Sequence, residues 1–111
     1  MPIFLSICIP TYNRGFYLNK TLNILSDQIN NLRITNVEIV VVDGNSTDDT
    51  SIIVNNYINK YKFIRYFKKK INGGVSRDYY LSIKNSLGKF CWMMSSDDLI
   101  EKDGVSKIVN I

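Results

Sequence analysis

Oxygen-rich side chains gather in three short segments, residues 10–14, 43–48 and 95–98, and each follows an apolar run. Carboxylates such as Asp97 and Asp98 are ligands that Mg²⁺ or Mn²⁺ accepts, with phosphate oxygens and water completing the coordination. Aspartates in this position are equally ordinary as caps of a following helix. Taken together, the three segments indicate groups that could bind a nucleoside diphosphate carrying a hard cation.

Other polar residues in these segments have two interpretations each. Asp43 could accept a hydrogen bond from a base N–H, or it could simply form a turn. Tyr12 could stack on a base or pack as an ordinary aromatic residue. Arg14 and Arg77 could meet phosphates or lie on the surface as solvated cations.

Several better-known motifs are absent from the sequence. There is neither a G-x-G-x-x-G pattern after the first apolar run nor a P-loop motif. A calcium loop starting at Asp43 fails because its sixth position is Asp48 and its twelfth is Val54. The chain has no histidine, which excludes nucleophilic sites that depend on one.

The elements that must position these residues follow from the apolar pattern. Short apolar runs at residues 3–9, 37–42, 63–67 and 90–94 predict four buried strands. Three helices are expected between them, and a further short helix after Asp98. Leu18, Leu22, Leu25 and Ile29 share one face of the first helix.

The ends of the second and third helices carry boundary signals. The second helix begins within residues 45–49, where a Ser or Thr hydroxyl can cap the amides, and it buries Ile53, Val54, Tyr57 and Ile58. The third runs from about residue 75 to 87, and Gly88 is expected to end it in a left-handed conformation.

This order predicts an α/β fold, β-α-β-α-β-α-β plus a C-terminal helix, with a mainly parallel sheet. In such a sheet the loops leaving the carboxyl ends of the strands line the ligand crevice. No linker or repeat divides the chain, so residues 1–111 are expected to form one domain.

Charge and composition narrow the class of protein. The net charge is +4, but six of the fourteen Lys and Arg residues lie in residues 60–70, so the basicity is local, and no nucleic-acid partner is expected. Cys8 and Cys91 lie in apolar runs and are expected to be buried free thiols. Neither a signal peptide nor a membrane span is apparent, which predicts a cytoplasmic protein.

Four ordered motifs carry a resemblance to a known family: residues 7–14 (ICIPTYNR), 40–50 (VVVDGNSTDDT), 72–76 (NGGVS) and 95–98 (SSDD). Together they resemble the successive motifs of family 2 glycosyltransferases with the Rossmann-like GT-A fold. Residues 74–79 (GVSRDY) and 88–98 (GKFCWMMSSDD) are similar to the abequosyltransferase-type branch, which adds dideoxyhexoses to O-antigen units.

The resemblance implies that this chain is the N-terminal, nucleotide-sugar-binding half of such an enzyme. The implied nucleotide-sugar-binding residues are Pro10, Thr11, Tyr12, Arg14, Asp43, Asn45, Arg77, Ser95 and Ser96. Asp97 and Asp98 are the implied metal ligands for Mg²⁺ or Mn²⁺, which would neutralise the departing diphosphate.

This sequence departs from the family pattern at two points. Ser95 replaces the first carboxylate of the D-x-D motif, and Arg77 substitutes for an arginine that normally lies further along its helix. The family's acceptor site and its Asp or Glu base come later in the chain, so the catalytic base is expected beyond Ile111.

The implied function is donor binding for transfer of a sugar to a bacterial surface polysaccharide or O-antigen acceptor. Expected partners are a nucleoside diphosphate sugar and a saccharide or lipid-linked acceptor, with peripheral contact at the cytoplasmic face of the membrane. A homodimer through an exposed sheet edge is also expected.

One alternative function is that of a non-catalytic nucleotide-binding or assembly module. Another alternative is a nucleotidyltransferase. That class normally has a Gly-rich, basic loop after its first strand, and the sequence of residues 10–13 (PTYN) argues against it.

Overall fold

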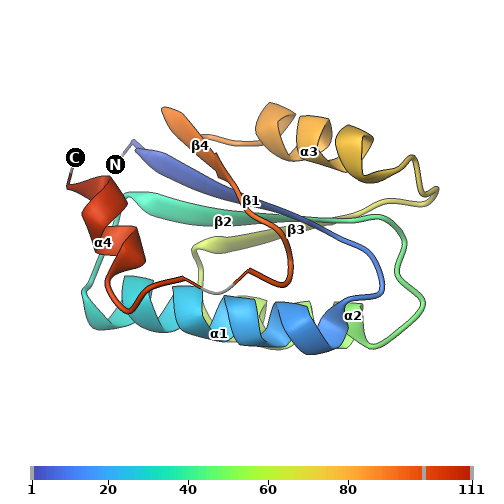
Figure 1. Cartoon of the computed structure of the whole chain (residues 1–111), viewed down its shortest axis with the longest axis horizontal. Helices are drawn as coiled ribbons and strands as arrows, with labels where there is room; N and C mark the ends of the chain where they lie inside the picture. Colours follow the sequence, from blue (N-terminus) through green and yellow to red (C-terminus); the bar gives the residue numbers. More distant parts are fainter. Residues whose placement is uncertain (1, 99, 111) are drawn as a thin grey trace.

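The computed structural model describes residues 2–98 and 100–110 and shows a parallel sheet between two layers of helices (Figure 1). The elements are β1 (Leu5–Thr11), α1 (Gly15–Asn31), β2 (Val37–Asp43), α2 (Thr50–Lys60), β3 (Ile64–Lys68), α3 (Val75–Lys84), β4 (Phe90–Met93) and α4 (Gly104–Val109). The element order and the short C-terminal helix match the prediction.

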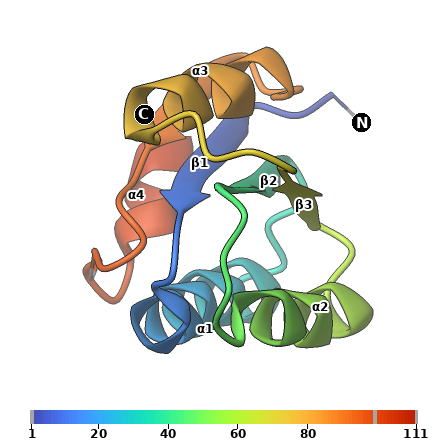
Figure 2. The ribbon, with the colours of Figure 1, turned by 90° about the vertical axis from the view of Figure 1, so that its right-hand side faces the viewer.

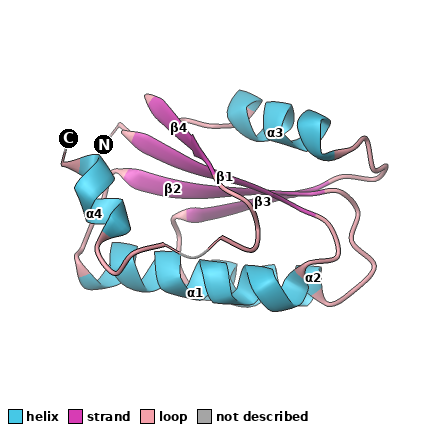
Figure 3. Ribbon diagram, viewed as in Figure 1, coloured by secondary structure: helices cyan, strands magenta, loops and turns pink. Residues whose placement is uncertain are grey.

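All strand pairings in the described part of the chain are parallel, and the sheet order is β3-β2-β1-β4. β1 is therefore a central strand, with Leu5 beside Val37 on one side and beside Phe90 on the other. Helices α1 and α2 cover one face and α3 covers the other (Figure 2). Figure 3 shows the strands running in one direction, so their carboxyl ends meet at one edge.

The core lies between the sheet and α1. Leu18, Leu22, Leu25 and Ile29 are at most 1% exposed, as their spacing predicts. Burying each of these side chains contributes about 1.5–3 kcal/mol. The inner face of α2 is less deeply packed, because only Val54 of its four expected residues is fully buried.

Both edge strands differ from the prediction of four buried strands, and in β3 only Ile64 is buried. Phe90 and Met93 are 52% and 55% exposed, because β4 pairs only with β1 among the described residues. Cys8 is a buried free thiol as predicted, but Cys91 is exposed, so that prediction is wrong for Cys91. Its position on the edge strand explains the difference.

The start of α2 and the end of α3 also differ from the prediction. The first helical residue of α2 is Thr50, and the Asp48 carboxylate rather than a Ser or Thr hydroxyl accepts the Thr50 N–H, at 3.0 Å. Helix α3 ends at Lys84, three residues before the predicted end at residue 87.

Gly88 is needed for close packing and not for a left-handed turn, since its φ is not positive. A Cβ atom at Gly88 would lie 2.5 Å from Ser6 Oγ and 2.7 Å from the Ser6 nitrogen. Glycine therefore allows the α3–β4 connection to pass directly over β1.

Within the described residues, no helix is both long and apolar enough to cross a membrane.

Candidate functional site

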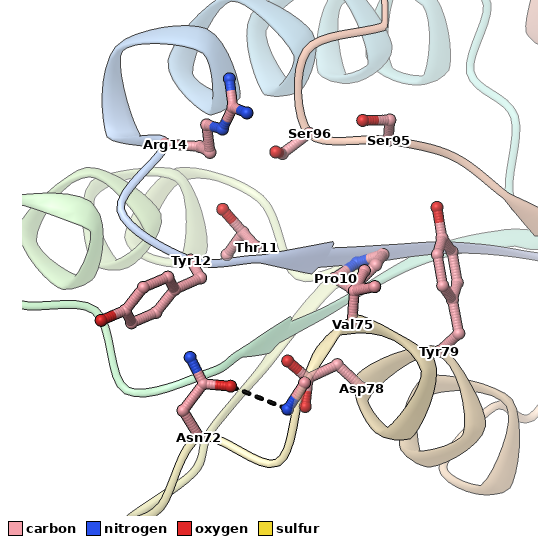
Figure 4. Close-up of a pocket in the computed structure, with 11 residues that line it drawn as sticks. Pro10, Thr11, Tyr12, Arg14, Asn72, Val75, Asp78, Tyr79, Ser95 and Ser96 are labelled. Atoms are coloured by element: carbon pink, nitrogen blue, oxygen red, sulfur yellow. Dashed lines mark hydrogen bonds between the residues drawn. The ribbon is translucent and has the colours of Figure 1, made fainter.

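A pocket of about 290 Å³ opens at the carboxyl ends of the strands (Figure 4). It is lined by Pro10, Thr11, Tyr12, Arg14, Asn72, Gly74, Val75, Asp78, Tyr79, Ser95 and Ser96. These residues come from the end of β1, from the loops that follow β1 and β4, from the loop before α3 and from the start of α3. The pocket is thus where the parallel topology predicts a ligand crevice.

The pocket unites six of the residues that the sequence singled out: Pro10, Thr11, Tyr12, Arg14, Ser95 and Ser96. Tyr12 is half exposed, so its ring is accessible to a flat ligand. Arg14 supplies a guanidinium group at the rim, suited to phosphate oxygens. Figure 4 shows Arg14 and the two serines on one side of the pocket, with Asn72 and Asp78 on the other.

Thr11 marks a place where a ligand is expected. Its Oγ1 is buried and has no hydrogen-bond partner, a property that it shares with only Ser26 Oγ among the buried side-chain polar atoms of the described residues. Because buried hydroxyls nearly always have a partner, the Thr11 hydroxyl has a hydrogen bond still to make at the pocket wall.

Asp43 does not line this pocket. Its side chain is fully buried, and both carboxylate oxygens accept hydrogen bonds. The backbone N–H of Ser46 donates to Oδ1 at 2.8 Å, and the Tyr66 hydroxyl donates to Oδ2. Burial and the bond to Asp43 raise the pKa of Tyr66 well above its ordinary range, so its hydroxyl stays a donor.

Asn45 and Arg77 also lie outside the pocket. Asn45 has a φ of 75° and donates its amide to the Lys70 carbonyl at 3.1 Å, which ties together the loops that follow β2 and β3. The Arg77 guanidinium carbon lies 5.1 Å from the ring centre of Tyr80, on the exposed face of α3. Both residues have local structural partners instead.

Asp97 and Asp98 lie exposed, immediately after the pocket residues Ser95 and Ser96. Each carboxylate has one oxygen engaged: Ser95 Oγ donates to Asp97 Oδ1 at 2.6 Å, and Ser95 N donates to Asp98 Oδ2 at 2.8 Å. The bond from Ser95 is the largest effect that holds the pKa of Asp97 below its ordinary value.

Asp97 and Asp98 fit a divalent cation whose remaining coordination positions are filled by a bound ligand. The described residues contain no group of three or more acidic, His or Cys side chains that could hold a metal by themselves. Mg²⁺ and similar ions commonly take one or two protein carboxylates together with phosphate oxygens and water. The second oxygens of Asp97 and Asp98 are the groups available for that role.

Two polar residues hold the loops around the pocket. Thr21 of α1 donates its hydroxyl to the carbonyl oxygens of Ser96 and Asp98, at 3.1 and 2.9 Å. Asn13, at a φ of 51°, accepts the N–H groups of Thr47 and Asp48 at 2.7 and 3.2 Å. The loops after β1, β2 and β4 are therefore fixed relative to one another.

Sequence reasoning assigned no role to five of the pocket residues: Asn72, Gly74, Val75, Asp78 and Tyr79. The signal that could have found them is the Asn72-Gly73-Gly74 turn, which follows β3 and opens α3. Gly74 has a φ of 92°, a conformation that strongly favours glycine. This turn directs the first residues of α3 toward the pocket.

Asp78 and Tyr79 give the α3 wall its polarity. Asp78 is 3% exposed and pairs with Lys69, whose Nζ lies 2.6 Å from Asp78 Oδ1. Burial and the nearby charges of Asp98 and Asp97 raise the pKa of Tyr79, so its hydroxyl remains a donor. Figure 4 shows that hydroxyl pointing toward the Ser95 side of the pocket.

The chain has similarities to known proteins over nearly its whole length. It is 37% identical over 106 residues to abequosyltransferase RfbV of Salmonella typhimurium, covering 94% of this chain and 31% of that protein. It is 36% identical over 98 residues to poly(ribitol-phosphate) beta-N-acetylglucosaminyltransferase TarS of Staphylococcus aureus, covering 88% of this chain and 17% of TarS. The chain therefore spans less than a third of the length of these two relatives.

Solved structures show the same fold. The crystal structure of S. aureus TarS 1-349 in complex with UDP superposes with a TM-score of 0.87 at 32% identity, covering 97% of this chain and 31% of that one. The mannosyltransferase PcManGT from Pyrobaculum calidifontis, in complex with GDP-Man and Mn²⁺, has a TM-score of 0.82 at 20% identity, which shows the fold alone.

These likenesses confirm the predicted α/β architecture, a Rossmann-like GT-A half-domain with a parallel sheet. The family model described as glycosyl transferase family 2 matches residues 6–111. The chain therefore belongs to glycosyl transferase family 2.

Proposed function

We propose that the pocket binds the nucleoside diphosphate part of a sugar nucleotide, and that this chain is the donor-binding half of a glycosyltransferase. The observation that carries the proposal is the pocket at the carboxyl ends of the strands, which brings together an aromatic ring, a guanidinium, two serines and the unpartnered Thr11 hydroxyl. The likeness to TarS, whose crystal structure contains UDP, supports it.

The pocket residues divide into a base-binding and a phosphate-binding side. Pro10, Tyr12 and Val75 offer apolar surface for a base and ribose, and the Thr11 hydroxyl has a hydrogen bond to give. Arg14 can pair with diphosphate oxygens, and Ser95 and Ser96 lie beside it in the pocket. Asn45 and Arg77 would contact the nucleotide only if the Asn45 loop or the Arg77 side chain moved toward the pocket.

The proposed reaction breaks the bond between the sugar anomeric carbon and the diphosphate as an acceptor hydroxyl attacks that carbon. Asp97 and Asp98 would hold Mg²⁺ or Mn²⁺, which supplies positive charge that stabilises the leaving diphosphate. Arg14 adds a permanent cation on the same side. No residue described here is assigned as the base that takes the acceptor proton, and we expect it outside this chain.

The acceptor side of the function is also a proposal. The resemblance to the abequosyltransferase branch favours a saccharide of a bacterial surface polysaccharide or O-antigen, free or lipid-linked, as the acceptor. A lipid-linked acceptor would place the reaction at the cytoplasmic face of the membrane. A homodimer formed through the exposed edge of β4 belongs to the same proposal, because Phe90 and Met93 are half exposed there.

One observation favours a second candidate, a non-catalytic nucleotide-binding module. Ser95 stands where the family has the first carboxylate of D-x-D, and its hydroxyl occupies one oxygen of Asp97. Tight nucleotide binding without metal dependence and without hydrolysis of the sugar donor would favour this module.

Calorimetric titration of UDP, CDP, GDP and dTDP, with and without Mn²⁺, tests the donor-site proposal. We expect one diphosphate to bind in a metal-dependent way and Asp97→Asn to weaken that binding at least tenfold. Asp27→Asn, which removes an exposed carboxylate on α1 away from the pocket, is the matched control and should bind normally. If a folded protein binds none of the four, the proposal is wrong.

A further inference from the structure

The outer face of α3 is apolar, although it is turned away from the sheet. Figure 2 shows α3 lying over the sheet on the side opposite α1 and α2, and its buried residues are the polar Asp78 and Ser82. Tyr80 and Ile83, three residues apart on the outer face, are 52% and 44% exposed. A helix of a soluble domain normally has the reverse arrangement, with its apolar stripe toward the core.

The exposed apolar surface continues before and after these two residues. Ile71 in the loop before α3 is 78% exposed, and Val75 in its first turn and Leu87 just after its end are also mostly exposed. Residues 71–87 thus hold five of the twelve exposed large apolar side chains of the described residues. A concentration of this kind marks an interaction surface.

Unpaired cations accompany these apolar side chains. Residues 68–90 contain six Lys or Arg residues and a single acidic residue, Asp78, which is buried and paired with Lys69. The other five cations are exposed and form no ion pair with a described residue: Lys68, Lys70, Arg77, Lys84 and Lys89. The segment therefore presents positive charge that no acidic side chain neutralises.

This combination fits an anionic lipid surface. A basic amphipathic helix binds a membrane interface by burying its apolar side chains at the acyl boundary while Lys and Arg meet the anionic headgroups. Tyr80 suits the interface as an aromatic residue, and the Arg77 guanidinium carbon lies 5.1 Å from its ring centre. A second copy of the chain fits less well, because two identical basic faces repel each other.

Val75 joins this face to the pocket, since it is exposed and also lines the pocket. We propose that the α3 surface, comprising the outer face of α3 and the exposed residues of 68–71 and 84–89, docks this chain onto an anionic membrane. The inference rests on the proposed function, because docking there would hold the donor pocket beside a bilayer that carries a lipid-linked acceptor.

Co-sedimentation with vesicles, in the absence of nucleotide, tests the proposal. We expect the chain to bind vesicles of phosphatidylcholine mixed with phosphatidylglycerol at least tenfold more tightly than phosphatidylcholine alone, and less tightly as salt rises. Lys84→Gln combined with Lys89→Gln should weaken binding at least tenfold, because each cation near an anionic surface contributes about fivefold. Ile83→Gln combined with Leu87→Gln should weaken it similarly, because these side chains would no longer insert.

Matched variants on the other side of the sheet control for charge and for apolar area. Lys20→Gln combined with Lys60→Gln removes the same charge from exposed positions of α1 and α2, and Ile52→Gln removes an exposed apolar side chain of α2. Both should bind the anionic vesicles within about threefold of the wild-type chain. Thermal melts verify that every variant is folded.

Three results would overturn the inference. The first is an absence of binding to the anionic vesicles, or equal binding to both kinds of vesicle. The second is binding that survives Ile83→Gln combined with Leu87→Gln, which would show charge attraction without docking of the apolar face. The third is self-association that this double variant abolishes, without vesicle binding, which would assign the face to a second copy.

The proposed function is tested separately, by diphosphate titration without vesicles. All the variants of the α3 surface should bind the preferred diphosphate normally, because none of the altered side chains lines the pocket. Failure of the folded wild-type chain to bind any diphosphate, with normal vesicle binding, would overturn the proposed function and leave the membrane-docking surface in place.

Discussion

Ser6 and Glu38 meet across the central strands β1 and β2, where the Ser6 hydroxyl donates a 2.6 Å hydrogen bond to Glu38 Oε2. Glu38 is 4% exposed and also accepts from Arg65 Nε at 2.9 Å and from the Leu87 N–H at 2.7 Å. This cluster joins three strands to the connection between α3 and β4, at the end of the sheet opposite the pocket.

Replacing Glu38 with Gln should destabilise the fold by about 1–3 kcal/mol at pH 7, because buried partners lose a charged acceptor. Burial raises the pKa of Glu38, but hydrogen bonds from Arg65, Ser6 and Leu87 outweigh it and hold the pKa below its ordinary value of 4.5. A lowered pKa stabilises the fold fully above about pH 4.5, and this contribution is lost as the pH falls toward the folded-state pKa.

Thermal melts of the wild-type chain and Glu38→Gln at pH 7 and at pH 3 check this prediction. The difference in Tm between them should shrink at pH 3, and an unchanged difference would contradict it.

Gly88→Ala should cost about 2–3 kcal/mol, since the added methyl would overlap Ser6 in a packed region. Gly104→Ala is the matched control, because the nearest atom to its Cβ is at an ordinary 3.6 Å, and its stability should stay within about 1 kcal/mol of wild type. Urea unfolding measures both, and equal stability of the two variants would show that the approach at Gly88 relaxes without cost.

Thr21→Val should weaken metal-dependent diphosphate binding roughly three- to tenfold, because the Ser96 and Asp98 carbonyls lose their shared donor. Thr21→Ser keeps the hydroxyl and should bind almost as wild type does. Titration of the preferred diphosphate with Mn²⁺ compares the two. Normal binding by Thr21→Val would mean that the loop of residues 95–98 is held by other contacts.

The exposed edge of β4 should support concentration-dependent dimers. Sedimentation under reducing conditions, which prevent a disulfide through exposed Cys91, should show a monomer–dimer equilibrium that Met93→Lys shifts to monomer. Leu32→Lys changes an equally exposed residue at the C-terminal end of α1 and should leave the equilibrium unchanged. A clean monomer at high concentration would refute the dimer.

The sheet, the helix order and the core face of α1 were predictable because they depend on the spacing of apolar residues along the chain. The exposure of Phe90 and Cys91 was not, since an apolar run looks the same in a central strand and in an edge strand. Gly88 shows a similar limit, because a glycine required by close packing cannot be distinguished by pattern from one required by a turn.

The candidate site was predictable where it lies at the carboxyl end of a strand or in the loop that follows, as with Thr11 and Ser96. It was missed on α3, where Asp78 becomes a pocket residue only because the Gly74 turn aims the helix and Lys69 pairs with it. The burial of Asp43 beneath Tyr66 is equally invisible in sequence, because those residues come together only when β2 and β3 pair.

The central position of β1 has a consequence for synthesis. The ribosome makes β1 before its second neighbour β4, which begins at residue 90, and the pocket wall at Ser95 and Ser96 comes later still. A nascent chain therefore carries the open edge of an apolar strand until β4 has emerged. Nucleotide capture at this pocket cannot assist folding before Ser96 has been made.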